Sequence, residues 1–90
     1  MAHDPQKLIF NVARRIAELR KEEKLTQDEL AAKLGATGGY VRLLESGKQN
    51  VTVATISKLA HYLNCDPKNF FETPTSDKSG PGRPPKSKKK

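Results

Sequence analysis

The stretch from Leu25 to Asn50 predicts two short helices joined by a tight glycine turn, and it constrains the fold more than any other part of the sequence. Thr26 is a suitable N-cap for the first of these helices, and Glu29, three residues later, completes the capping-box pattern. Gly35 stands where a helix commonly ends in a left-handed residue, and Thr37 can cap the second helix. A turn this short leaves the two helices crossing in a helix-turn-helix arrangement.

Three further helices are predicted from similar start and stop signals. Asp4-Pro5 marks the start of a long first helix that ends near Lys24, because an acidic cap followed by proline is a common helix start. Thr52 can cap a fourth helix that closes near Asn64, and Asp66-Pro67 opens a short fifth helix. The apolar residues that recur along these helices are Leu8, Val12, Ile16 and Leu19 in the first, Val53, Ile56, Leu59, Ala60 and Leu63 in the fourth, and Phe70 and Phe71 in the fifth.

These signals predict an all-α fold, a compact five-helix domain over residues 5–72 followed by a tail over residues 73–90. Proline, glycine, serine and lysine dominate the tail, so we expect it to be disordered when unbound. Residues 75–90 carry six basic groups against one acidic group, whereas residues 1–74 carry eleven against nine. Most of the positive charge therefore lies in the tail, where it favours polyanions without distinguishing DNA from RNA or anionic lipid.

Composition argues against several classes of protein. Only 34% of the residues are apolar and tryptophan is absent, so a deep ligand cavity is not expected. No apolar run approaches the ~20 residues that span a membrane, and no signal-peptide pattern occurs. A single cysteine, Cys65, fits a reducing cytoplasm. The two histidines, one cysteine and scattered carboxylates show no metal-ligand spacing and no nucleophile–base pair, so we expect no metal, no cofactor and no enzymatic activity.

Several separated motifs, in the right order, resemble the helix-turn-helix domain of the phage-repressor family (Cro/cI-like, or XRE). The motifs are Leu25-Thr26-Gln27-Asp28-Glu29-Leu30-Ala31, Leu34-Gly35, Tyr40-Val41, Glu45-Ser46-Gly47-Lys48, Thr55-Ile56-Ser57-Lys58-Leu59-Ala60, Cys65-Asp66-Pro67 and Phe70-Phe71. The resemblance covers roughly residues 12 to 71 and implies a lambda-repressor-like fold. Gln49-Asn50-Val51-Thr52, where many members have proline, also resembles the subgroup of restriction-modification controller proteins.

The resemblance implies that the third helix enters the DNA major groove, where its first turn normally reads base edges. In this chain that turn holds Thr37, Gly38, Gly39 and Tyr40. Two glycines inside a helix cost about 1 kcal/mol each relative to alanine, which close backbone approach to DNA would offset. The alternative is that the turn is simply a poor helix start, or that another surface binds.

The two glycines lack the side chains that family members often use to read bases. Arg42 is therefore the best candidate for sequence readout, through a bidentate contact with guanine. Thr37 and Tyr40 suit phosphate or thymine-methyl contacts. Leu43 suits a thymine methyl, or is one of the exposed leucines that are common on protein surfaces.

Phosphate contacts are assigned from the resemblance. Gln27 opens the second helix, where family members commonly hold a phosphate. Lys48, Asn50 and the backbone amides near Thr52 follow the third helix and are candidates to clamp the same strand. The alternative for Lys48 is an ordinary solvated lysine.

Two further sets of residues are given structural roles. Arg20 and Glu45 match a pair that in family members bridges the first helix to the third. Leu63, Phe70 and Phe71 are predicted at a two-fold dimer interface, formed by the fifth helix and the end of the fourth. Because two adjacent phenylalanines cannot both enter one small core, one should remain partly exposed as an adhesive patch.

The tail contains Pro81-Gly82-Arg83-Pro84, which resembles the Gly-Arg-Pro core of an AT-hook. In such a hook an extended arginine, here Arg83, lies in the narrow minor groove of A·T-rich DNA. A full hook usually has basic residues directly on both sides of its core, but Ser79 and Pro81 precede this one. A non-specific, solubilising lysine tail is the equal alternative.

The sequence therefore predicts a sequence-specific, dimeric DNA-binding transcriptional regulator of a prokaryote or phage, located in the cytoplasm with the nucleoid. Its expected partners are double-stranded DNA and a second copy of the chain, because one small domain reading a few base pairs discriminates poorly. Two alternatives remain open. One is an antitoxin-like or complex-assembly module that binds another protein, and the other is an architectural DNA binder that depends on the tail.

Overall fold

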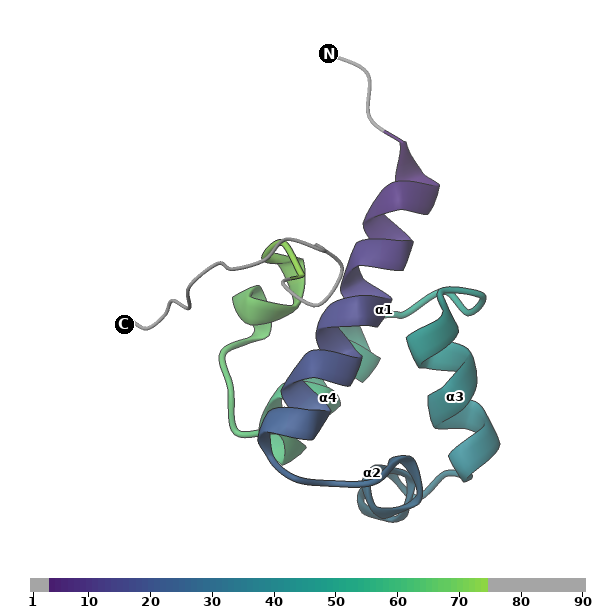
Figure 1. Ribbon diagram of the computed structural model, residues 1–90, viewed down its shortest axis with the longest axis vertical. Coiled ribbons are helices and arrows are strands. Elements are labelled where there is room, and N and C mark those ends of the chain that lie inside the picture. Colours follow the sequence, from purple (N-terminus) through teal and green to yellow (C-terminus); the bar gives the residue numbers. More distant parts are fainter. Residues whose placement is uncertain (1–3, 75–90) are drawn as a thin grey trace, which may run out of the picture.

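The computed structural model describes residues 4–74, which form four α-helices and one 3₁₀ helix (Figure 1). The elements are α1 (Pro5–Glu22), α2 (Gln27–Leu34), α3 (Gly38–Ser46), α4 (Val53–Tyr62) and the 3₁₀ helix η1 (Pro67–Phe71). No strand occurs among these residues, so the predicted all-α fold is confirmed. The predicted fifth helix is present, but its five residues adopt the tighter 3₁₀ form. Within residues 4–74 no helix has the length and apolar character needed to cross a bilayer.

Each helix begins with a side-chain cap, supplied by Asp4, Thr26, Thr37, Thr52 and Asp66. The capping box at the start of α2 is complete. The Glu29 N–H donates to Thr26 Oγ1 at 3.0 Å, and the Thr26 N–H donates back to Glu29 Oε1 at 2.8 Å. One such cap contributes about 0.5–2 kcal/mol, so the caps fix where the helices begin.

Glycines end α2 and α3. Gly35 has φ +70° and Gly47 has φ +81°, the left-handed conformation that favours glycine. A Cβ at Gly47 would meet the Phe10 ring at 3.0 Å. The absence of a side chain at Gly47 therefore also allows the loop after α3 to pack closely against α1.

Helices α1 and α4 end slightly earlier than predicted. Helix α1 ends at Glu22, two residues before Lys24, which has φ +60° and so lies outside the helix. Helix α4 ends at Tyr62, two residues before Asn64, which has φ +59°. Neither position is a glycine, and the apolar pattern gives no sign of a left-handed residue there.

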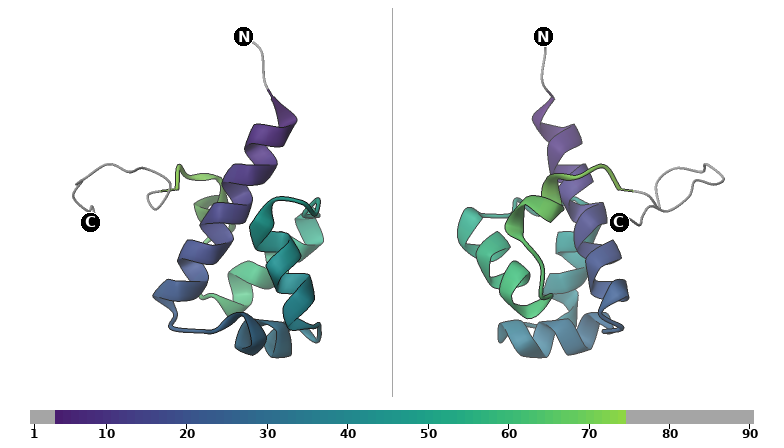
Figure 2. Two further views of the ribbon diagram at one scale, coloured as in Figure 1. Left: turned by 45° about the vertical axis from the view of Figure 1, so that its right-hand side comes forward. Right: turned by 90° about the vertical axis from the view of Figure 1, so that its left-hand side faces the viewer.

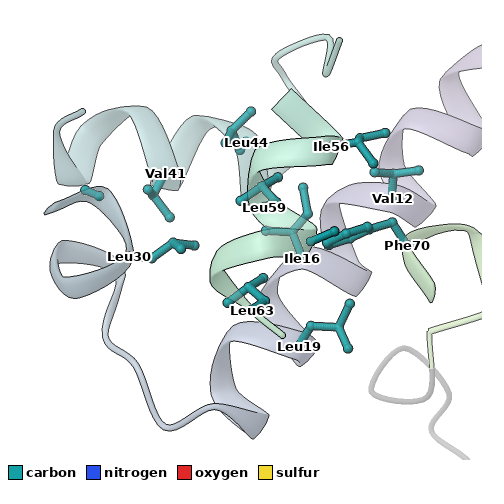
Figure 3. Packing of buried hydrophobic residues seen from close by; sticks show 12 residues of the cluster. Val12, Ile16, Leu19, Leu30, Val41, Leu44, Ile56, Leu59, Leu63 and Phe70 are labelled. Atoms are coloured by element: carbon teal, nitrogen blue, oxygen red, sulfur yellow. The ribbon is translucent and has the colours of Figure 1, made fainter. Parts of the chain in front are cut away.

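Side chains from all five elements meet in one hydrophobic core. Phe70 of η1 lies beside Val12 and Ile16 of α1, whereas Leu30 and Val41 fill the side formed by α2 and α3 (Figure 3). Phe70 is the largest fully buried side chain, which contributes about 1.5–3 kcal/mol relative to an exposed one. The cluster comprises Val12, Ile16, Leu19, Leu30, Ala31, Val41, Leu44, Ile56, Leu59, Ala60, Leu63 and Phe70.

Three apolar residues from the predicted helical patterns remain exposed. Leu8 is 37% exposed, Val53 is 83% exposed and Phe71 is 50% exposed. They lie along a groove between the start of α1, the start of α4 and η1. This apolar groove is lined by Leu8, Ile9, Val12, Val51, Val53, Ile56 and Phe71. The expectation that only one of the two adjacent phenylalanines enters the core agrees with the burial of Phe70 and the exposure of Phe71.

A buried arginine on α1 holds η1 in place. Arg15 Nε donates to the Asn69 carbonyl at 2.8 Å, and its Nη atoms donate to Glu18 at 2.7 Å and Glu72 at 3.3 Å. Asn69 and Glu72 lie 54 and 57 positions along the chain from Arg15. Sequence reasoning missed this role, because no local pattern signals a contact over that separation.

Candidate nucleic-acid interface

Helices α2 and α3 are separated by the three residues 35–37. The Ala36 N–H donates to the Ala31 carbonyl at 2.9 Å, and the Gly35 N–H donates to the Ala32 carbonyl at 3.2 Å, which closes α2. In both views of Figure 2, α2 lies at the lower end of the domain and α3 rises from it. Helix α3 also packs against α1. The short turn therefore sets α3 across α2 with one side toward the core.

One face of α3 is buried and the opposite face is exposed. Val41 and Leu44 are fully buried, whereas Arg42 and Leu43 are exposed. Residues three or four positions away from these two share their face, because the helix repeats every 3.6 residues. The exposed stripe of α3 consists of Arg42, Leu43 and Ser46, and the half-buried Gly39 lies on the same face at the start of the helix.

Some hydrogen-bonding groups in the first turn of α3 are already paired within the domain. The Thr37 hydroxyl accepts a hydrogen bond from the Tyr40 N–H at 3.1 Å, which leaves its own proton available to a partner. Tyr40 is half-buried and packs against the hydrophobic core. Thr37 is exposed, so of these two predicted contacts it is the more accessible.

The Arg42 side chain folds back over the first turn of α3. Its Nη1 lies 3.6 Å from the position that a Cβ would occupy at Gly38, and its Nη2 lies 3.7 Å from that position at Gly39. Long helical side chains commonly point toward the helix N-terminus in this way. The two glycines therefore leave room for the guanidinium at the end of α3 where base readers normally sit.

Arg20 and Glu45 form a buried ion pair that connects α1 to α3. Arg20 Nε donates to Glu45 Oε2 at 2.7 Å, and Arg20 Nη2 donates to Glu45 Oε1 at 3.1 Å. Arg20 Nη1 also donates to the Leu25 carbonyl at 2.7 Å. The two side chains are only 10% and 8% exposed. This bidentate geometry fixes how α3 is rotated about its own axis.

Gln27, predicted as a phosphate contact, belongs to the same network. Its Nε2 donates to Glu45 Oε1 at 3.0 Å. An amide nitrogen carries two hydrogens, so one donor remains for another partner. Gln27 is half-buried at the start of α2, which places that remaining donor near the surface.

The segment after α3 presents polar residues to solvent. Lys48, Asn50 and Thr52 are exposed. The Lys48 N–H donates to Ser46 Oγ at 3.2 Å, which orders the start of the loop. The Thr52 hydroxyl accepts the Thr55 N–H at 3.1 Å as the cap of α4.

The predicted dimer residues are not all at the surface. Leu63 is 2% exposed and Phe70 is fully buried, so both pack inside the single chain and are not available to a second copy. These two residues therefore belong to the core, whereas the prediction placed them at the dimer interface. Phe71 is the one of the three predicted residues that reaches solvent.

Pro74, which the sequence placed in the tail, is buried, so the folded body extends slightly beyond the predicted boundary at residue 72. Arg83 and the rest of the chain from residue 75 onward lie outside the described residues.

Within residues 4–74, no group of three or more histidine, cysteine, aspartate or glutamate side chains is arranged to hold a metal ion. Cys65 packs against the core, and burial raises the pKa of its thiol, with Arg15 acting in the opposite direction. The thiol is therefore neutral at pH 7, as expected of a structural cysteine rather than a reactive one.

Two helices held by a three-residue turn, with one face of the second exposed, define a helix-turn-helix domain. The helix-turn-helix family model HTH_3 matches residues 16–70 of this chain. The chain therefore belongs to the HTH_3 helix-turn-helix family, and the predicted family resemblance is confirmed.

Individual relatives agree with this assignment. An uncharacterized HTH-type transcriptional regulator from Sinorhizobium fredii is 42% identical over 52 residues, which cover 58% of this chain and 68% of the relative. The structure of the restriction-modification controller protein C.AhdI from Aeromonas hydrophila is similar with a TM-score of 0.71 and 35% identity, covering 77% of this chain and 100% of that chain. An HTH_3 family transcriptional regulator from Vibrio cholerae has a TM-score of 0.67 and 27% identity, covering 73% of this chain and 37% of that chain.

The buried ion pair gives a prediction about stability. Glu45→Ala leaves the Arg20 guanidinium buried without its carboxylate, so the free energy of unfolding should fall by about 3–5 kcal/mol. Urea denaturation followed by circular dichroism measures this decrease. The single variants Arg20→Met and Glu45→Leu each leave one buried charge without its partner, whereas the double variant Arg20→Met/Glu45→Leu removes both charges and should be destabilised by much less than the sum of these two. Additive effects would contradict a coupled pair.

Proposed function

We propose that this protein is a sequence-specific, dimeric DNA-binding transcriptional regulator that inserts α3 into the major groove. The observation that carries the proposal is the exposed stripe of α3, which Glu45 holds in one orientation. The Arg42 guanidinium at the start of this helix suits a bidentate contact with guanine N7 and O6. Leu43 lies beside it and suits a thymine methyl. Membership of the HTH_3 family supports the same function.

The charges around α3 favour approach to a polyanion. Glu45 is the one acidic residue of α3, and its carboxylate is paired with Arg20 inside the domain. Arg42 and Lys48 are exposed. The exposed charges of α3 and of the residue pair that follows it are therefore positive, which favours DNA phosphates, and the exposed carboxylate beside the start of α3 belongs to Asp28 of α2.

Four further groups suit contacts that position the domain without reading sequence. Gln27 and Thr37 each keep one hydrogen-bond donor after their internal contacts. Lys48 and Asn50 are exposed directly after α3. With Gln27 and Thr37 before the exposed stripe and Lys48 and Asn50 after it, these groups suit phosphates at both ends of α3.

The exposed apolar groove supports the dimeric part of the proposal. Val53, Phe71 and Leu8 expose apolar surface together, on a side of the domain that includes no residue of α3. A second copy related by two-fold symmetry would cover this surface and leave both α3 helices free. Two half-sites would then be read at once, which supplies the discrimination that a single short helix lacks.

For the tail, we propose that residues 75–90 add phosphate contacts. A narrower form of this proposal places Arg83 in the minor groove. The support for the phosphate contacts is the sequence alone, which has six basic groups against one acidic group in this segment. This charge would add affinity on any DNA sequence.

Arg42→Ala should weaken binding to the preferred DNA site by about 1–3 kcal/mol and flatten the preference at one base pair. The site is first found by selection from random DNA, and fluorescence anisotropy then gives the affinities. Lys68→Ala is the matched control, because it removes one positive charge from η1, which packs on α1 and α4 (Figure 1). An Arg42→Ala protein that keeps wild-type base preference would contradict the assignment, and a wild-type protein without any preference would favour the architectural role.

Val53→Asp should convert the dimer into a monomer in solution, because it places a charge on the apolar groove. Val53 is 83% exposed in the first turn of α4, so the substitution should leave the fold intact. Sedimentation equilibrium at high micromolar concentration measures the mass. Ser57→Asp adds the same charge to an exposed position of α4 outside the groove and should leave the dimer intact. A monomeric wild-type protein, or two variants that behave alike, would contradict this interface.

Removal of residues 75–90 should weaken preferred and random DNA by similar factors. It should also lower the salt dependence of binding by up to about one unit of slope for each phosphate that the tail no longer neutralises. Titrations at several salt concentrations measure both effects. Arg83→Ala separates the two versions, because a minor-groove arginine should matter for sites flanked by A·T tracts and not for those flanked by G·C. Equal weakening on sites with A·T and with G·C flanks would mean that Arg83 contributes only positive charge, like the other basic residues of the tail.

A further inference from the structure

The side chain of Asp28 occupies the space that a side chain at Gly38 would need. Asp28 lies in the first turn of α2 and is exposed. A Cβ built on Gly38 would collide with an oxygen of the Asp28 carboxylate. The Asp28 carboxylate therefore lies directly over the first residue of α3. At this position, members of the family often carry a side chain that reads bases.

Arg42 reaches the same place from the other direction. Its Nη1 and the Asp28 carboxylate lie within 4 Å of one point, the Cβ position of Gly38. Within residues 4–74, no hydrogen bond or ion pair engages either the Asp28 carboxylate or the Arg42 guanidinium. One acceptor group and one donor group therefore lie side by side at the N-terminal end of α3, neither of them engaged by another group of the described domain.

These two groups are complementary to neighbouring bases. A carboxylate accepts a hydrogen bond from the N4 amino group of cytosine, and a guanidinium donates to N7 and O6 of guanine. Guanine and thymine present acceptors in the major groove, so they would repel the carboxylate. A carboxylate gains nothing from phosphates, so its place beside the base readers favours a role in discrimination.

We propose that Asp28 is a second specificity-determining residue, which reads a cytosine next to the guanine read by Arg42. The proposal rests on the DNA-binding function proposed above and deepens it. A side chain of α2 thereby supplies the reading group that Gly38 lacks. The preferred half-site should then contain adjacent C and G positions under the start of α3.

Asp28→Ala tests this directly. Selection from random DNA followed by affinity measurements should show discrimination for cytosine falling by roughly 5- to 150-fold at one position, with the guanine preference of Arg42 retained at the next. Removing a negative charge near DNA also strengthens binding to every sequence. Glu22→Ala, which removes an exposed carboxylate at the end of α1, controls for this uniform effect.

Gly38→Ala provides an independent variant that keeps the carboxylate. Alanine is a better helix former than glycine, so α3 should be retained, whereas the new methyl group displaces Asp28. The same cytosine preference should fall. Asp28→Asn should instead shift the preference at that position toward adenine, because an amide can make two hydrogen bonds to adenine N6 and N7.

The outcomes separate this inference from the broader proposal. A change confined to the Arg42 position would overturn the inference, because Asp28 would then only orient Arg42. An unchanged profile for Asp28→Ala beside a clear wild-type preference would also overturn it, while leaving the DNA-binding proposal in place. A wild-type protein with no sequence preference would overturn both.

Discussion

The buried contact between Arg20 and Glu45 determines how α3 stands against the rest of the domain. A nine-residue helix is marginal by itself in water, so its position comes from tertiary packing. Val41 and Leu44 give that packing but allow rotation of the helix, because apolar contacts are not directional. The bidentate pair of hydrogen bonds from Arg20 to Glu45 is directional. A buried ion pair adds little net stability compared with apolar residues of similar size, so its main effect here is on the orientation of the exposed stripe.

Much of the fold was predictable because its signals are local. A cap such as Thr37 bonds a backbone N–H only three residues away, so the residue types alone indicate where a helix begins. Burial of Val41 and Leu44 follows from helical spacing in the same way. The helix ends were less predictable, since Lys24 and Asn64 adopt positive φ without being glycine. The five-residue η1 is too short for periodicity to show which phenylalanine faces the core.

What the sequence did not reveal depends on contacts between distant segments. From the sequence alone, Arg15 cannot be distinguished from a surface arginine. Its role becomes visible only in the packed structure, where η1 lies against it. Asp28 has the position of an ordinary acidic residue at a helix start. Only the packed structure shows that its carboxylate lies over Gly38 of α3. The burial of Leu63 also depended on how the helices pack together, and Leu63 is part of the hydrophobic core here. The family pattern located the candidate site, but the neighbours of each side chain required the packed structure.

The central place of Phe70 has a consequence for how the protein is made. During translation the N-terminal part of the chain emerges from the ribosome first, so α1 through α4 emerge before Phe70. Until then the core lacks its largest buried side chain, and Arg15 lacks the Asn69 carbonyl that it binds. Contacts over such a separation form late because they close a long loop. The complete hydrophobic core is therefore a property of the finished domain, and translation products that end before η1 would lack both its largest buried side chain and the carbonyl that Arg15 binds.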